Sequence, residues 1–99
     1  MIRHIVAFAM ASDDAAERAA HAAEGAARLN ALVGVVPSLR AMTAGGNVLA
    51  LGQNWDLALV ADFDDEDGLN AYLVHPAHEA AAAYIGSVRG DRVAVDIVI

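Results

Sequence analysis

The stretch LNAYLVHPAHEAAAAYI, from Leu69 to Ile85, decides the fold because it ends one helix and begins another. Pro76 has no amide hydrogen and disfavours helical backbone at the residue before it, so the helix that carries Tyr72 should end near His75. A second helix can start with Pro76 in its first turn, where the missing donor costs nothing. The sequence therefore predicts two short consecutive helices here.

His78 falls in the first turn of the second helix. Ile85 follows seven residues later on nearly the same face, with Ala81 and Ala82 between them, so the ring should point along an apolar stripe. Burial and the positive end of the helix dipole both favour the neutral imidazole, which is the form that can accept a proton. The alternative is that His78 only caps or packs the helix start and that His75 fills the turn.

Length and composition indicate a single domain over residues 1–99, and the absence of cysteine excludes disulfide and thiol chemistry. The net charge of −7 and the scattered arginines argue against nucleic acid binding. The apolar run from Ile5 to Ala11 is too short to span a membrane. We therefore expect a cytoplasmic protein without nucleic acid or membrane partners.

About a quarter of the residues are alanine and five are aromatic, so a single chain can bury little side-chain volume. Small domains with thin cores usually need a disulfide, a metal or a second subunit. The sequence offers no metal motif and no sign of a cofactor, so we expect neither. Association into a homodimer is the prediction that remains.

Residues 2–10, IRHIVAFAM, read as a strand that is apolar on both faces. His4, Val6 and Phe8 share one face, and Ile5 and Ala7 share the other. A sheet of this kind must be covered on both sides, and a domain of this size has too few helices to do so. The uncovered face is a second indication of a dimer formed sheet to sheet.

A long helix is predicted from the capping candidates Ser12, Asp13 and Asp14 to about Val33, with Gly34 closing it. Its apolar stripe should consist of Ala15, Ala19, Ala22, Ala26, Leu29 and Val33. His21 falls on the opposite face between charged residues, so we expect a solvated surface histidine.

Two strands and then the two short helices are predicted between the long helix and the last strand. Leu39–Thr43 reads as a short strand, and Trp55–Phe63 is the clearest strand, with a glycine-containing loop between them. Alternation places Trp55, Leu57, Leu59, Ala61 and Phe63 on one face and Ala58 and Val60 on the other. Asp64 is the expected cap of the helix that carries Tyr72.

Gly86 and Gly90 should end the last helix, and Arg92–Ile99 should form the final strand. The predicted order is β-α-β-β-α-β. This is an α+β, ferredoxin-like arrangement with a four-stranded antiparallel sheet and helices on one face.

Four segments together resemble the stress-responsive dimeric α/β-barrel (Dabb) family: IRHIVAF, WDLALVADF, LNAYLVHPAH and RVAVD. The resemblance implies that two ferredoxin-like subunits pair their sheets into a barrel. The family includes plant polyketide cyclases, in which a tyrosine and a histidine of this helical element and a histidine of the first strand act on a linear poly-β-ketone. By position these residues match Tyr72, His78 and His4.

The resemblance and the residues lead to two classes of function. In the first, His78 is a general base, Tyr72 orients it or stabilises an enolate, and His4 shares the pocket in a lyase or cyclase-type reaction on a carbonyl compound. In the second, the protein binds a small organic ligand without catalysis, or is a structural stress-response protein. The ligand-binding residues that we expect are His75, Phe8, Val60 and Leu29. The first helix carries Ala26, Ala27 and Leu29 where those cyclases have aromatic residues, which leaves the substrate open.

Overall fold

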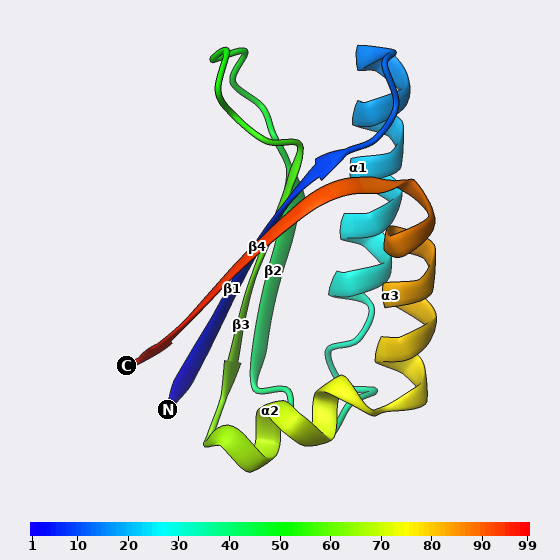
Figure 1. Cartoon of the computed structure of the whole chain (residues 1–99). Coiled ribbons are helices and arrows are strands. Elements are labelled where there is room, and N and C mark those ends of the chain that lie inside the picture. The colour runs from blue at the N-terminus through cyan, green and yellow to red at the C-terminus, as the bar shows by residue number, and fades with distance from the viewer.

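The computed structural model describes all residues, 1–99. Its elements in chain order are β1 (Ile2–Met10), α1 (Ala15–Asn30), β2 (Ala41–Gly46), β3 (Leu57–Phe63), α2 (Glu66–Leu73), α3 (Pro76–Val88) and β4 (Arg89–Val98). The strands form one antiparallel sheet in the order β2-β3-β1-β4. This confirms the predicted ferredoxin-like α+β fold. The helices lie on one side of the sheet (Figure 1).

Alternation along the strands separates a core face from an open face. The core face of β1 carries Val6 and Phe8, and with Leu57 and Phe63 of β3 it packs against the helices. The open face carries Val60 and, on β4, Val93 and Val95, which are 36%, 49% and 54% exposed. The sheet therefore buries one side and leaves aliphatic side chains exposed on the other.

The first helix is shorter than the sequence predicts. Asp14 caps α1 by accepting a hydrogen bond from the Ala16 amide, and Ala22, Ala26 and Leu29 are buried as expected. The helix ends at Asn30 instead of Val33, and the chain then turns through Gly34, whose φ of 82° is the only positive value in the protein. Val33, which lies beyond this end, is exposed, and so are the predicted stripe residues Ala15 and Ala19 at the start of the helix.

Gly25 explains how α1 approaches the rest of the core so closely. A Cβ atom at this position would lie 3.1 Å from Leu57 Cδ2 and 3.3 Å from Ile85 Cγ1. Both distances are shorter than ordinary van der Waals contact, so a side chain here would push α1 away from β3 and α3.

His21 of α1 is half-buried and its Nδ1 has no hydrogen-bond partner, which corrects the expectation of a solvated side chain.

The two middle strands begin two residues later than predicted. β2 starts at Ala41 and runs on through the predicted loop glycines to Gly46, and β3 starts at Leu57. Trp55 precedes a bend at Asp56, whose amide donates to the Phe8 carbonyl oxygen. Strand alternation does not extend across this bend, so the prediction that Trp55 shares the face of Leu57 is wrong.

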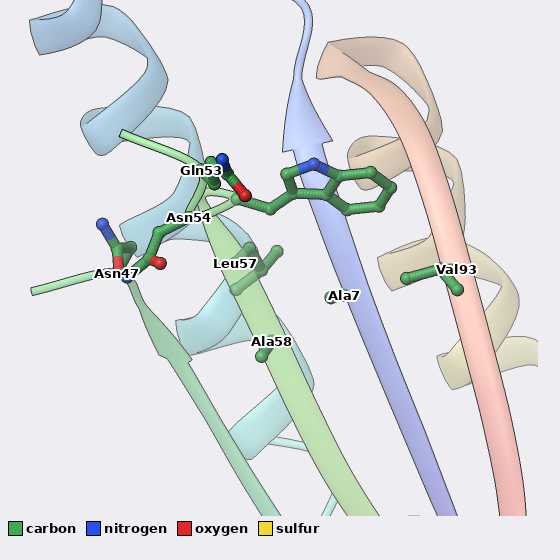
Figure 2. Close-up of a pocket in the computed structure, with 8 residues that line it drawn as sticks. Ala7, Asn47, Gln53, Asn54, Leu57, Ala58 and Val93 are labelled. Atoms are coloured by element: carbon green, nitrogen blue, oxygen red, sulfur yellow. Dashed lines mark hydrogen bonds between the residues drawn. The ribbon is translucent and has the colours of Figure 1, made fainter. Parts of the chain in front are cut away.

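Trp55 instead lines a hollow on the open face of the sheet. Ala7, Ala58 and Val93, from three adjacent strands, line the same hollow (Figure 2). The indole is 38% exposed there.

The break between α2 and α3 follows the prediction from Pro76. α2 ends at Leu73, His75 has extended backbone at φ −70° and ψ 134°, and Pro76 opens α3. The cap of α2 is Asp65, which accepts from the Gly68 amide, and not Asp64, which pairs with Arg40 at 2.8 Å. At the far end, Gly86 lies inside α3 and Gly90 inside β4, so neither ends the helix.

Candidate functional site

A cavity of about 210 Å³ lies between the core face of the sheet and the helices. Three of the sequence-predicted site residues line it: His4 from β1, Tyr72 from α2 and His78 from α3. Phe8 and Leu29, which we expected to bind a ligand, also line it. The remaining lining residues are Val6, Leu59, Leu73, Ala82, Ile85, Gly86, Arg89 and Arg92.

His78 is held by the break between the two helices. Its Nδ1 lies 3.1 Å from the Leu73 carbonyl oxygen, and because a carbonyl can only accept, Nδ1 carries the hydrogen. In the neutral ring, Nε2 is then the nitrogen with a free lone pair. Burial lowers the pKa of His78 and the positive charge of Arg92 lowers it further, whereas the bond to Leu73 and the charge of Glu79 oppose this shift. The neutral, proton-accepting form is therefore favoured.

Tyr72 contributes a buried hydroxyl without a partner. The residue is 1% exposed, and its ring lies between Phe63 and His78, with centroid separations of 5.0 Å and 4.2 Å. Its hydroxyl makes no hydrogen bond within the protein. Burial raises the pKa of Tyr72 to about 12, so at neutral pH the group is a hydrogen-bond donor and not a base. An unpaired buried donor is costly, which is typical of a site where a ligand supplies the partner.

His4 is oriented by a carboxylate on the neighbouring strand. Its Nδ1 lies 2.5 Å from Asp96 Oδ1, and the two residues face each other in the register of β1 and β4. A carboxylate in this position fixes which ring nitrogen carries the hydrogen, so Nε2 of the neutral ring is the acceptor. His4 is 6% exposed, whereas the Asp96 side chain is 48% exposed, so the contact joins a buried ring to a carboxylate that is open to solvent.

Two predicted ligand-binding residues lie outside the cavity. Val60 follows the buried Leu59 in β3, so its side chain points to the open face of the sheet. His75 turns back on its own helix, where its Nδ1 accepts a hydrogen bond of 3.0 Å from the Ala77 amide. The residue that caps α3 is therefore His75, and not His78 as the alternative interpretation had it. Neither Val60 nor His75 lines the cavity, so the structure does not support the expectation that they bind a ligand there.

Sequence reasoning did not single out Asp96, Arg89 or Arg92. The signal was present in the last strand, where alternation places Arg92 and Asp96 on one face and Val93 and Val95 on the other. The sequence pattern does not reveal how β4 pairs with β1. In the structure this register sets Asp96 opposite His4 and Arg92 opposite Phe8. Without that register, neither side chain could be assigned to the cavity.

The linings of the other two large hollows contain fewer side chains that are free to react or to bind a ligand. The hollow of about 440 Å³ on the open face has no titratable side chain in its lining. A third, of about 650 Å³ beside α1 and the β2–β3 loop, contains Arg18 and Asp56, which pair with each other at 3.7 Å. No group of three histidine, cysteine, aspartate or glutamate side chains comes together in a way that could hold a metal ion. The cavity of His78 is the candidate site.

Comparison with known proteins agrees with this architecture. Residues 2–99 match the Stress responsive A/B Barrel Domain family, Dabb. The chain belongs to the Dabb family. An uncharacterized protein from Streptomyces coelicolor is 34% identical over 83 residues, 84% of either chain.

Solved structures place the Dabb chain among dimeric relatives. A dimeric ferredoxin-like protein of unknown function from Thermobifida fusca is 35% identical, with a TM-score of 0.83 over 99% of this chain and 90% of that one. A hydroxynitrile lyase from Passiflora edulis shares the fold at 15% identity, with a TM-score of 0.77 over 99% and 92% of the two chains. No helix of the Dabb chain is long and apolar enough to cross a membrane.

Proposed function

We propose that this Dabb protein binds a small organic carbonyl compound in the cavity and removes a proton next to the carbonyl group. The observation that carries the proposal is the state of His78. Its Nδ1 hydrogen is held by the Leu73 carbonyl oxygen, which leaves Nε2 to accept a proton, and its ring packs on Tyr72, whose hydroxyl has no partner. A general base and a free donor beside one cavity are the groups that enolate chemistry requires.

The chemical step follows from these roles. The carbon–hydrogen bond next to the carbonyl breaks, the proton passes to Nε2 of His78, and the electron pair moves onto the carbonyl oxygen. The Tyr72 hydroxyl donates a hydrogen bond to that oxygen, where negative charge develops. Lyase and cyclase-type reactions, including those on polyketide-like substrates, can begin with such a step.

The proposal includes a homodimer formed through the open face of the sheet. Val60, Val93, Val95 and Ile97 expose aliphatic surface on that face, which has no helix to cover it. Contiguous apolar surface of this kind is typical of subunit contacts. The relative from Thermobifida fusca is described as dimeric, which supports association into a dimer.

Deuterium uptake into the methyl group of acetophenone, a single-ring ketone, tests the catalytic role. In D₂O the wild-type protein should exchange these protons faster than buffer, and His78→Ala should lower the enzymatic rate by about 10² to 10⁴, as for one positioned base. His21→Ala is the matched control, because His21 lines neither this cavity nor the hollow beside α1. A folded His78→Ala protein with full exchange would contradict the proposal, and binding without any exchange would favour the non-catalytic alternative.

A further inference from the structure

The arginines of this acidic chain divide into two groups. Four pair with a carboxylate: Arg3 with Asp62, Arg18 with Asp56, Arg28 with Glu24 and Arg40 with Asp64. The other two, Arg89 and Arg92, make no ion pair, and both line the cavity. In a chain with a net charge of −7, carboxylates outnumber cations, so two unpaired arginines beside one cavity need an explanation.

Both unpaired arginines lie on β4, on the side of the sheet that faces the helices. Arg92 is opposite Phe8 and Arg89 is opposite Met10 in the pairing of β4 with β1. Both side chains are exposed, so they lie at the mouth of the cavity and not on its floor. The charge of Arg92 reaches the site, since it contributes to the lowered pKa of His78.

The lining contains no aspartate or glutamate that could neutralise these cations. The nearby Asp96 carboxylate is engaged by His4 at 2.5 Å. The deeper lining is apolar, with Val6, Leu59 and Ile85. The site thus combines an apolar interior, a cationic mouth and the buried, unpaired hydroxyl of Tyr72.

We propose that the ligand of this cavity carries a carboxylate, which Arg92 and Arg89 bind at the mouth while the carbonyl group lies inside by Tyr72 and His78. Guanidinium groups bind carboxylates through two parallel hydrogen bonds, which fixes orientation as well as charge. The volume of about 210 Å³ is below the roughly 300–1,000 Å³ of common ligand sites, which favours a compound of about one ring. The inference rests on the proposed function and narrows its substrates to small carbonyl compounds with a carboxylate.

A comparison of the affinities for benzoate and for benzamide, its neutral analogue of similar shape, isolates the contribution of the ligand's negative charge. In ¹H–¹⁵N NMR titrations at neutral pH, benzoate should shift the resonances of cavity residues and bind more tightly than benzamide. Arg92→Gln should weaken benzoate binding about 10- to 100-fold, the usual effect of losing a hydrogen bond to a charged group, and should leave benzamide binding unchanged. Arg89→Gln, and the double variant, should act in the same direction.

Arg40→Gln is the matched control, because it removes the same charge from an exposed pair outside the cavity. Equal affinity for benzoate and benzamide, no binding of either, or unchanged benzoate binding in the double variant would overturn the inference. The readout is independent of catalysis. If the protein exchanges the acetophenone protons but binds benzoate no more tightly than benzamide, the proposed function stands and the carboxylate inference fails. If benzoate binding depends on the arginines but no exchange occurs, only the catalytic proposal fails.

Discussion

Tyr72 shows how one side chain can weaken the fold and serve the site. Its hydroxyl is removed from water without gaining a hydrogen bond within the protein, although the ring packs well between Phe63 and His78. Leaving a polar group buried and unpaired costs about 1–3 kcal/mol. Such a cost persists where the group has a use, and the use that we propose for Tyr72 is donation to a ligand oxygen.

The Tyr72→Phe variant should therefore separate stability from activity. Removing the hydroxyl should leave the free energy of unfolding unchanged or raise it by up to about 1 kcal/mol. The melting temperature should accordingly stay the same or rise. Ketone exchange should fall by up to about 10² to 10³ if the hydroxyl stabilises the developing negative charge. Thermal melting and deuterium uptake on the same sample measure both effects. A destabilised variant with unchanged exchange would show that the hydroxyl is structural.

Which site residues could be predicted depended on local geometry. His78 and Tyr72 follow from helix periodicity and the Pro76 break, and His4 follows from strand alternation; the structure brings all three to one cavity. Val60 was misassigned because alternation separates its face from that of Leu59 but does not say which of the two faces meets the helices. The contact of Asp96 with His4 depends on the register between β1 and β4. The two residues are 92 positions apart in the sequence, so no local pattern predicts that they face each other.

At the scale of elements, the break between two helices was easier to predict than the end of a helix. Pro76 fixes the α2–α3 break because it acts on its own backbone and on the preceding residue. The end of α1 at Asn30 has a tertiary cause: the Asn30 amide group donates to and accepts from the backbone of Ala44 in β2, at 2.9 Å each way. Such long-range contacts decide helix ends that local propensity leaves open.

Strand β4 presents two chemically different faces. Arg92 and Asp96 face the helices and the candidate site, while Val93, Val95 and Ile97 face the open side. The strand therefore serves the cavity with one face and the proposed dimer with the other.

Val95→Glu should convert the dimer to a folded monomer, because it places a charge in the centre of the proposed contact. Sedimentation velocity at micromolar concentration gives the mass, and circular dichroism checks the fold. Ala83→Glu is the control, since it adds the same charge at an exposed position of α3, and it should remain dimeric. A wild-type protein that is monomeric at this concentration, or a dimeric Val95→Glu variant, would contradict the proposed interface.

At the scale of the whole molecule, the layers explain why the candidate site and the proposed dimer contact do not compete for the same surface. All three helices lie on one side of the sheet (Figure 1). The cavity lined by His4, Tyr72 and His78 lies between these helices and the sheet. The other face is left for a second subunit. A chain with a thin, alanine-rich core can in this way use association for stability and still keep a cavity in each subunit.

The central claim is that neutral His78 is the base, and the pH dependence of ketone exchange tests it most directly. Burial lowers the pKa of His78 below its ordinary value of 6.5, so the ring is neutral at pH 7 and becomes protonated only as the pH falls through that lowered pKa. Exchange should consequently be constant near pH 7 and decline in acid, with a midpoint below 6.5 that coincides with the titration of the His78 ring followed by NMR. The midpoint should be absent from His78→Ala. A midpoint above 6.5, or one that persists in His78→Ala, would contradict the account.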